Sequence, residues 1–568
     1  MNHKLAKSAS FIIILTCIAA LSFSIRPAKA SPATIYIRSD GSIDPPTAPI
    51  QRDGNLYTLL GNINESIIVQ RNNIVIDGQS HRIQGIGAMF SKGIDLSGRK
   101  NVTVQNVEVE AFFYGIDLEY GATNNNISRN IITDNTWTGI FLSGSSNNTI
   151  IENNLAHNYV GINLDTSSNN RVIGNIFSGD GLAIYDSHKN TIEGNVINGK
   201  PLVYLESVSH QTVDNAGQVI LNNCSDIRVE NLNLSNTTVG LESWATNNSK
   251  IINNTMSNNA FGIWLHSDSS NNTISKNTIT NTIYIGIYLI ASSNNTITDN
   301  SITNSLDGVM LDSTSNYNSI ARNDIKYSSE YGISLIGSSY NTIYHNNFID
   351  NTQQAHITPA SSPHFWDNGY PSGGNYWSDY NGTDTNRDGL GNSPYQLSTF
   401  NQDNHPLMGP FHTCSMGSWN GKQYNIDTIS NSSITNFSFN PDNQTLSFTV
   451  EGTDDTAGFC RVTIPEGFMW CDIPDEWVVK VGITLIGDRN IIEQGDYTYI
   501  YFTYTHSLKT VEIKSTHAVP EFPFGIILPL LLITALLTAL FCKGKDHTLT
   551  ETTQETAIRP SQEKKLKM

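Results

Sequence analysis

The sequence predicts an all-β solenoid, in which short strands are wound into stacked coils, and three observations support this fold class. An asparagine recurs every 23 residues, a phrase of the form Gly-Ile-x-Leu falls between successive asparagines, and the apolar stripe at 3.6-residue spacing that helical repeats need is missing. Short runs with apolar residues at alternate positions, split by Asn, Gly and Ser, are typical of strands joined by turns. The regular asparagines are Asn231, Asn254, Asn277, Asn300, Asn323 and Asn346.

These asparagines predict an inward-facing ladder of side-chain amides. Stacked coils lie about 4.8 Å apart, so one asparagine per coil at one register can bond to the next. Ordinary turn formation is the alternative for any single asparagine, because this residue suits turns. A less regular series continues the ladder upstream through Asn106, Asn130, Asn153, Asn175 and Asn195.

The repeat resembles the NosD-like, pectin-lyase-like group of right-handed parallel β-helix proteins. The phrases that carry the resemblance include Gly115-Ile-Asp-Leu118 and Gly262-Ile-Trp-Leu265, together with an interruption at residues 199–217 and the closing stretch Gly374-Asn-Tyr-Trp-Ser-Asp-Tyr380. The resemblance implies a right-handed parallel β-helix of about a dozen coils over residues 31–351, in a surface protein of archaeal type. It implies little about activity, because this scaffold carries many functions.

Composition excludes one class of partner. The chain of 568 residues has 33 Lys+Arg against 51 Asp+Glu, a formal charge of −18, which argues against nucleic acid. Many Asn-x-Ser/Thr triplets would accept glycans in an exported glycoprotein, although an Asn-Thr-Ile repeat also creates such triplets by accident.

The N-terminal segment predicts export. Lys4 and Lys7 precede an apolar run from Phe11 to Phe23, and Ala28-Lys-Ala30 forms a small-x-small cleavage site. Residues 1–30 are therefore predicted to be a signal peptide.

The C-terminal segment predicts a membrane anchor. Pro520-Glu-Phe-Pro523 introduces an uncharged apolar run from Phe524 to Cys542 that is long enough to span a bilayer. We expect a single span within residues 518–545, a cytoplasmic polar tail at 546–568, and the rest of the chain on the extracellular face. The Pro-Glu-Phe-Pro entry resembles archaeal sorting signals, which leaves open whether the span is retained or processed.

Residues 352–411 are predicted to cap the solenoid and to contain a calcium loop. The repeat stops there, and Trp366, Trp377 and several Tyr and Gly residues appear. The stretch from Asp384 to Gly389 has the oxygen spacing of the first half of an EF-hand loop. The predicted ligands of a structural Ca²⁺ are Asp384, Asn386, Asp388, Leu390 and Asn392, but Tyr395 stands where a bidentate Glu is expected, and a plain turn is the alternative.

Soft metal ligands gather just beyond the loop. NosD-like proteins are associated with copper delivery, so the resemblance implies a second alternative function as a copper accessory protein. The spacing of these residues matches no compact metal motif, and the sequence favours the absence of copper. The residues are His405, Met408, His412, Cys414 and Met416.

Residues 412–517 are predicted to form a β-sandwich-like domain. Alternating runs such as Thr445-Leu-Ser-Phe-Thr-Val450 are typical of sandwich strands. In an exported chain Cys460 and Cys471 are predicted to form a disulfide. The sequence leaves open whether Cys224 and Cys414 pair or stay as thiols.

The sequence favours a role without catalysis. Glu119 and Asp165 follow Gly-Ile-x-Leu phrases two coils apart, about 10 Å, and are candidates for a glycosidase pair. The Asn-Thr-Asp, Asp-Asp and Gly-His-Gly sets of related polygalacturonases are missing from the repeat, and no Lys or Arg base is found beside an acidic cluster. A hydrolase, lyase or epimerase acting on polysaccharide remains the alternative function.

The x positions of the Gly-Ile-x-Leu phrases predict a ligand. Because Ile and Leu face the core, x should face outward, and the x residues should stack in one column along the rod. The column reads Asp117, Phe141, Asn163, Glu242, Trp264, Tyr288, Met310 and Ser334. Trp264, Tyr288 and Met310 are predicted to form an exposed strip that binds an envelope polysaccharide or glycan, unless a loop or the cap covers them.

Overall fold

A computed structural model describes residues 34–419 and 421–519 of the chain, which belong to two compact units divided after His412. The predicted signal peptide, the apolar run from Phe524 and the polar tail lie outside the described residues. Within the described residues, no helix is long and apolar enough to cross a membrane.

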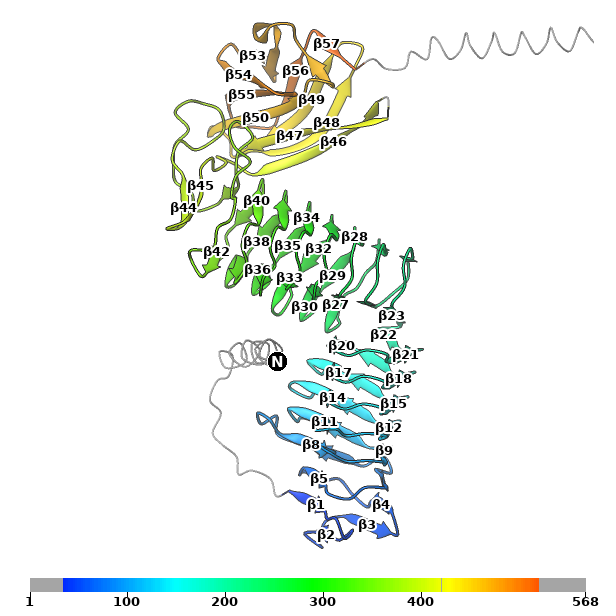
Figure 1. Cartoon of the computed structure of the whole chain (residues 1–568). Coiled ribbons are helices and arrows are strands. Elements are labelled where there is room, and N and C mark those ends of the chain that lie inside the picture. Colours follow the sequence, from blue (N-terminus) through cyan, green and yellow to red (C-terminus); the bar gives the residue numbers. More distant parts are fainter. Residues whose placement is uncertain (1–33, 420, 520–568) are drawn as a thin grey trace, which may run out of the picture. The chain divides into compact units, whose positions relative to one another are not determined.

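The first unit is the predicted parallel β-helix. It has about 13 coils, and strands of successive coils pair in parallel along their length (Figure 1). A typical coil consists of β8 (Lys92–Asp95), β9 (Val102–Gln105) and β10 (Glu108–Glu110), one strand in each of three sheets. The structure divides the coils into an N-terminal stack, residues 34–197, and a C-terminal stack, residues 200–377.

Three sheets form the N-terminal stack. Sheet 1 contains β8 with β2 (Ile43–Asp44), β1 (Ile35–Ile37), β5 (Ile67–Val69), β11 (Tyr114–Leu118), β14 (Thr138–Ser143), β17 (Val160–Asp165) and β20 (Leu182–Tyr185). Sheet 2 contains β9 with β3 (Ile50–Asp53), β4 (Leu56–Leu59), β6 (Ile74–Asp77), β12 (Asn126–Ser128), β15 (Thr149–Ile151), β18 (Arg171–Ile173) and β21 (Thr191–Glu193). Sheet 3 begins with β10 and β7 (Arg82–Gln84), β13 (Ile131–Thr133), β16 (Asn154–Ala156), β19 (Ile176–Ser178) and β22 (Val196–Ile197).

The C-terminal stack continues sheet 3 and adds two sheets. Sheet 3 goes on through β23 (Lys200–Glu206), β25 (Gln218–Asn222), β27 (Val239–Trp244), β30 (Phe261–His266), β33 (Ile285–Ile290), β36 (Asp307–Asp312), β39 (Tyr331–Ile336) and β42 (Gln353–Thr358). Sheet 4 contains β24 (Thr212–Val213), β26 (Arg228–Glu230), β28 (Lys250–Ile252), β31 (Thr273–Ser275), β34 (Thr296–Thr298), β37 (Ser319–Ala321) and β40 (Thr342–Tyr344). Sheet 5 contains β29 (Thr255–Ser257), β32 (Thr278–Thr280), β35 (Ser301–Thr303), β38 (Asp324–Lys326), β41 (Asn347–Ile349) and β43 (Tyr376–Trp377).

The two stacks meet at a chain reversal. β22 pairs with β23 in the antiparallel direction, across a turn in which Asn198 and Gly199 both have positive φ. After this hairpin the Gly-Ile-x-Leu strands occupy sheet 3, whereas before it they occupy sheet 1. The x positions therefore form two columns on two different sheets, and the single continuous column predicted from the sequence is wrong.

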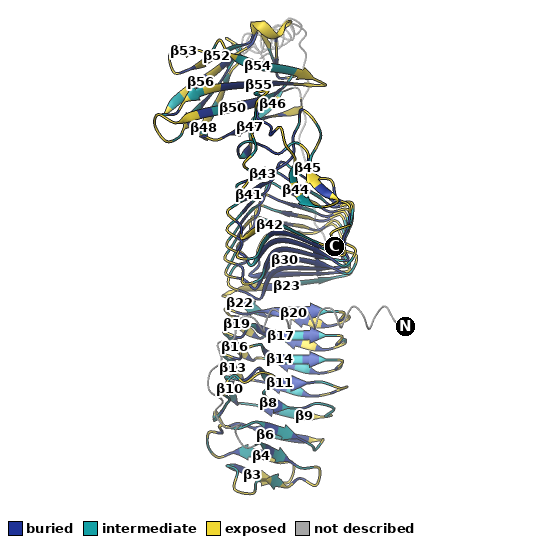
Figure 2. Cartoon of the chain, turned by 90° about the vertical axis from the view of Figure 1, so that its left-hand side faces the viewer, coloured by how far each residue is buried: buried dark blue, intermediate teal, exposed yellow. Residues whose placement is uncertain are grey.

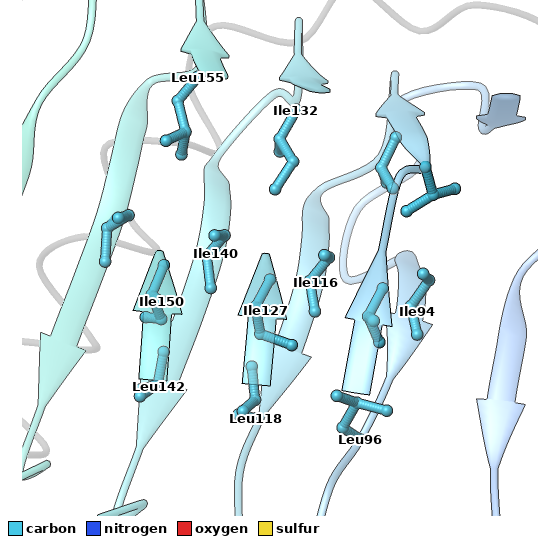
Figure 3. Packing of buried hydrophobic residues seen from close by; sticks show 14 of the residues in the cluster. Ile94, Leu96, Ile116, Leu118, Ile127, Ile132, Ile140, Leu142, Ile150 and Leu155 are labelled. Atoms are coloured by element: carbon cyan, nitrogen blue, oxygen red, sulfur yellow. The ribbon is translucent and has the colours of Figure 1, made fainter. Parts of the chain in front are cut away.

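The interior of each stack is a set of aliphatic columns. Ile94, Ile116 and Ile140 stack in register in sheet 1 and are fully buried, as Figure 3 shows for the N-terminal stack. Strand β9 alternates between buried and partly exposed positions, whereas β30 of sheet 3 is buried throughout (Figure 2). Stacked coils thus bury one continuous core that no single coil could form.

The glycine of each Gly-Ile-x-Leu phrase is required by a close approach between coils. A Cβ added at Gly262 would lie 2.5 Å from the carbonyl oxygen of Gly286 and 2.7 Å from Cγ2 of Ile279. Any larger residue would push neighbouring coils apart, which is why the phrase recurs with glycine at its head.

The predicted asparagine ladder is present from Asn254 onward. Each buried Nδ2 donates to Oδ1 of the next coil's asparagine at 2.9–3.1 Å, through Asn254, Asn277, Asn300, Asn323, Asn346 and then Asn375 of the cap. A parallel ladder in the N-terminal stack joins Asn130, Asn153, Asn175 and Asn195. A further ladder there runs from Asn135 through Asn158 to Asp180.

Asn231 is not a member of the ladder, which corrects the prediction. It is exposed, has a φ of 60°, and accepts a hydrogen bond from Nδ2 of Asn253 outside the stack. The buried ladder position of that coil belongs to Leu232, whose backbone N–H donates to Oδ1 of Asn254. The coil is 22 residues long rather than 23, so the constant spacing pointed to the neighbouring turn residue. Asn106 likewise lies next to the ladder position of its coil, which belongs to Val107.

The last coil is covered by residues that follow it. Trp377 stacks on Phe348 with ring centroids 4.5 Å apart and on Tyr395 at 4.6 Å. The buried carboxyl of Asp403 accepts hydrogen bonds from the backbone N–H of Asn375 at 2.7 Å and from the Trp377 indole at 2.9 Å. A small hairpin of β44 (Tyr395–Ser398) and β45 (Asn401–Asp403) completes this cover.

The second unit contains two antiparallel five-stranded sheets around a separate core. One sheet has β46 (Phe411–Trp419), β47 (Lys422–Ser430), β50 (Ala457–Pro465), β55 (Tyr497–Thr505) and β54 (Arg489–Gln494). The other has β48 (Ser433–Asn440), β49 (Thr445–Glu451), β56 (Lys509–Lys514), β52 (Val478–Val481) and β53 (Thr484–Leu485). The pair β51 (Met469–Trp470) and β57 (His517–Ala518) and the 3-10 helix η1 (Pro474–Glu476) lie outside these sheets.

The predicted disulfide between Cys460 and Cys471 is wrong. Both are free thiols, as are the other two described cysteines, Cys224 and Cys414. Cys460 lies on β50 and Cys471 just after β51, and both side chains pack into the apolar core of the second unit. A buried thiol behaves there as a small apolar side chain.

Candidate functional site

The strip predicted to bind a glycan is not exposed. Trp264, Tyr288 and Met310 stack in register on sheet 3 as expected, but their exposed fractions are 3%, 5% and 5%. They form an apolar cluster with Phe261 and Ile285, against which Tyr159 and Tyr185 of the N-terminal stack pack. After the chain reversal the two stacks pack against each other at this cluster, so the strip is buried between them.

Side chains of the C-terminal stack close the open edge of sheet 1. The Gln218 side chain accepts from the backbone N–H of Leu182 at 3.0 Å and donates to the carbonyl of Leu182 at 2.6 Å. The carboxyl of Glu242 accepts from the N–H of Ile184 at 3.2 Å and lies 3.1 Å from the imidazole of His266. Burial raises the pKa of Glu242, and the His266 contact opposes that rise.

The outer side of sheet 1 carries a dense group of charges, here named the acidic face. Its members are Lys92, Asp95, Asp117, Glu119 and Asp165, with Tyr114 and Phe141 among them. The Lys92 ammonium lies 2.9 Å from Glu119 and 3.7 Å from Asp95, and it also pairs with Asp117. Asp95 and Asp117 are register partners on neighbouring strands, so Lys92 offsets the repulsion of stacked carboxylates.

Burial changes the pKa values of the carboxyl groups on this face. It raises the pKa of Asp117 to about 7, although the hydrogen bond and charge of Lys92 act in the opposite direction. Burial also raises the pKa of Asp165. Burial alone would lower the pKa of Lys92, but its bonds to Asp117 and Glu119 hold that pKa above its ordinary value.

An aromatic ridge runs beside the acidic face. Rings from four successive coils pack in a row, with centroids 5.3 Å apart for Phe90 and Phe113, 5.7 Å for Phe113 and Trp137, and 4.8 Å for Trp137 and Tyr159. On the face itself, the rings of Tyr114 and Phe141 stack at 4.8 Å and are half-buried. Flat rings beside carboxylates are the combination that sugar faces and hydroxyls fit.

A hollow of about 410 Å³ opens at the N-terminal end of the acidic face. Most residues of the segment 85–92 line it, together with Thr34, Ser66, Ile68, Asp95 and Phe112. Met89 and Phe90 of that segment are about half exposed.

The structure places both carboxylates that the sequence proposed as a glycosidase pair on this face. Asp165 ends β17 and Glu119 follows β11, and the charge of Glu119 acts on Asp165. The sequence interpretation missed Lys92 and held that no basic residue stands beside an acidic cluster, which is wrong. The signal was available: Gly93-Ile-Asp-Leu96 repeats Gly115-Ile-Asp-Leu118 one coil earlier, with Lys92 immediately before it.

The predicted calcium loop folds around its own side-chain oxygens. The carboxylate of Asp384 accepts from the backbone N–H groups of Asp388 at 3.0 Å and Gly389 at 2.9 Å. The Asn386 amide donates to Asp388 at 2.7 Å and accepts from Asn392 at 2.8 Å. Hydrogen bonds within the loop therefore bring Asp384, Asn386, Asp388 and Asn392 together, while Leu390 is buried.

The soft ligands beyond the loop are divided between the two units. In the described ranges, no three or more His, Cys, Asp or Glu side chains are grouped so that they could hold a metal ion. Met416 packs against the core of the second unit, whereas His405 lies against Tyr370 in the first.

Two family models match the chain. A model described as "Periplasmic copper-binding protein (NosD)" matches residues 205–382, and one described as "Right handed beta helix region" matches residues 67–217. The first match ends before the soft ligands at residues 405–416. No curated protein matches the chain.

Several solved structures are similar in part. The A-module of a mannuronan C-5 epimerase from Azotobacter vinelandii shares 15% identity, covering 55% of this chain and 79% of that one, with a TM-score of 0.23. The catalytic domain of an α-1,3-glucanase in complex with tetrasaccharides shares 15% identity, covering 58% and 71%, with a TM-score of 0.25. A tailspike protein of an E. coli bacteriophage in complex with a pentasaccharide shares 8% identity, covering 81% and 73%, with a TM-score of 0.26. TM-scores this low carry no argument about function.

Proposed function

We propose that this chain, a NosD-like right-handed parallel β-helix protein, binds a polysaccharide along the acidic face of its N-terminal stack. The observation that carries the proposal is the pair of stacked, half-buried rings of Tyr114 and Phe141 among the carboxyls of that face. Aromatic rings offer flat surfaces to sugar C–H groups, and carboxylates accept hydrogen bonds from sugar hydroxyls. A surface whose structure repeats from coil to coil suits a polymer whose sugar units also repeat.

Removing the two rings should weaken binding to immobilised cell-envelope polysaccharide about tenfold or more. Each ring contact is worth on the order of 1 kcal/mol, and 1.4 kcal/mol corresponds to a factor of ten. The measurement compares the full chain with its Tyr114→Ala/Phe141→Ala variant by surface plasmon resonance.

The matched control for this experiment is Tyr317→Ala. Tyr317 is 59% exposed on a turn of the C-terminal stack, far in sequence from the face, so its loss should leave binding unchanged. Melting curves must show that both variants stay folded. If the double variant binds as tightly as the wild type, the acidic face is not the binding site.

We also propose that the protein is exported and held at the extracellular face of the membrane. The support is the signal-peptide pattern of residues 1–30 and the apolar run from Phe524 to Cys542. Protease shaving of intact cells should release fragments from residues 34–519 while a cytosolic marker protein stays whole. Recovery of the intact chain in the cytosolic fraction would overturn this proposal.

Structural calcium in the cap is a further proposal, supported by the convergence of Asp384, Asn386, Asp388 and Asn392. Added Ca²⁺ should raise the melting temperature of the full chain by several degrees, and chelator should reverse the rise, because a ligand that binds the native state stabilises it. Asp384→Asn should abolish the response, and the exposed Asp134→Asn in the repeat should keep it. An identical response of wild type and Asp384→Asn would remove the claim.

A further inference from the structure

The hollow at the N-terminal end of the acidic face combines apolar walls with a carboxylate. Phe90, Phe112 and Ile68 provide carbon surface, and Asp95 provides the carboxylate. Its volume of about 410 Å³ lies within the usual range of small-molecule sites. It is continuous with the acidic face, because Asp95 is the register partner of Asp117 on the next strand.

The positive charge of Lys92 at this site is already engaged in ion pairs. Lys92 is the one cationic residue among the described residues that line the hollow. Its ammonium contacts Asp95, Asp117 and Glu119 and lies 3.5 Å from the Ser97 hydroxyl. Arg99, close by in sequence, donates to the backbone carbonyls of Ser97 and Gln70.

The carboxyls, by contrast, outnumber that cation. Asp95, Asp117, Glu119 and Asp165 share the face with one lysine. Oδ1 of Asp117 has no hydrogen-bond partner among the described residues, although the residue is fully buried. The partly exposed Asp95, Glu119 and Asp165 therefore outnumber the one lysine of the described part of the face, and that lysine is already paired and does not receive an anionic sugar.

We propose that the polysaccharide held by this face carries amino sugars with free, protonated amines, and that polyuronate chains are rejected. This inference rests on the proposed binding function and adds the chemical class of the ligand. An ammonium group on the sugar would meet Asp95 in the hollow and Glu119 or Asp165 along the face, where opposite charges attract at short range. A uronate carboxylate would meet like charge at the same positions.

The experiment compares the full chain on three immobilised polysaccharides at low salt: chitosan, dextran and polygalacturonate. Chitosan should bind about tenfold or more tightly than uncharged dextran, and polygalacturonate should not be retained. The preference for chitosan should fall as salt is raised, because exposed charges are screened over about 10 Å at 0.1 M.

Two variants separate charge selection from binding itself. Glu119→Gln/Asp165→Asn should reduce the preference for chitosan over dextran about tenfold, because the amides keep an acceptor oxygen but carry no charge. Glu119→Lys/Asp165→Lys should gain binding to polygalacturonate. Retention of polygalacturonate by the wild type, or a preference unchanged by both variants, overturns the amino-sugar inference while the binding function stands. Retention of none of the three overturns both.

Discussion

Replacing Asn300 with leucine should destabilise the first unit by about 3–5 kcal/mol. Its Oδ1 accepts from both the backbone N–H and the side-chain amide of Asn277, and its Nδ2 donates to Ile274 and Asn323. Leucine has nearly the same shape and offers neither acceptor nor donor, so two buried donors of Asn277 lose their partner. Each unsatisfied buried group costs about 1–3 kcal/mol. Chemical denaturation of the full chain, followed by the fluorescence of the buried tryptophans, measures the loss.

Two comparisons test whether the ladder, rather than asparagine in general, carries this stability. Asn154→Leu makes the same change at an exposed position on β16, next to ladder member Asn153, and should alter stability by about 0.5 kcal/mol or less. Asn231→Ala removes an asparagine at the same 23-residue spacing but outside the ladder, and should cost about 1 kcal/mol through its positive φ. Equal effects of Asn300→Leu and Asn154→Leu would contradict the ladder account.

Replacing Asp180 with asparagine should stabilise the first unit by on the order of 2–4 kcal/mol at pH 8 and have little effect at pH 4. Asp180 ends the ladder that begins at Asn135, and it accepts from Nδ2 of Asn158 at 2.7 Å. Its Oδ1 has no hydrogen-bond partner among the described residues, and burial raises its pKa from 3.8 to about 7. Each tenfold change in the acid dissociation constant corresponds to about 1.4 kcal/mol, which gives the upper end of this range.

The direction of this pH dependence follows from the number of protons that the folded and the unfolded chain bind. Between pH 4 and 7 the folded chain keeps the proton on Asp180 while the unfolded chain releases it, so the wild type loses stability as pH rises through this window. Because asparagine is neutral at every pH, the variant does not lose stability in this way. Melting temperatures of both proteins from pH 4 to 8 should diverge with rising pH. Parallel curves, or a variant less stable at pH 8, would show that Asp180 is not a buried acid of this kind.

The coil architecture could be predicted because it is local and repeated. Alternating Ile and Leu set the inward face, glycine marks the close approach, and the ladder asparagine recurs in nearly every coil. The prediction of the ladder residues was wrong where it relied on the 23-residue spacing alone. At Asn231 one coil is a residue shorter than its neighbours, and only hydrogen bonding distinguishes the buried ladder position from the adjacent turn.

The surroundings of the predicted strip could not be predicted from the repeat, because they depend on the chain reversal. Asn198-Gly199 is a strong signal for a two-residue hairpin, and it marks the point where the stack turns. Without it, Trp264 and Tyr288 were placed in one column with Asp117, although they lie on another sheet. The acidic face itself follows from register, since Lys92 stands one position before a phrase whose repeat sets Asp95 beside Asp117. That Tyr159 and Tyr185 cover the predicted strip depends on contacts between distant parts of the chain, which no local pattern contains.

The ladders also have a direction, and one ladder of each stack ends on an acid. One N–H of each linking amide donates to the next coil. The series closes on the buried Asp180 in one stack and, in the other, on Asp403, which accepts from the backbone N–H of Asn375. Identical coils are self-complementary from head to tail, so an uncovered last coil would accept the first coil of another copy and grow into a fibre. The side chains of Gln218 and Glu242 on the edge of β20, together with the tryptophan cover, remove that template. These ends, rather than the repeat, oppose head-to-tail stacking of one copy on another.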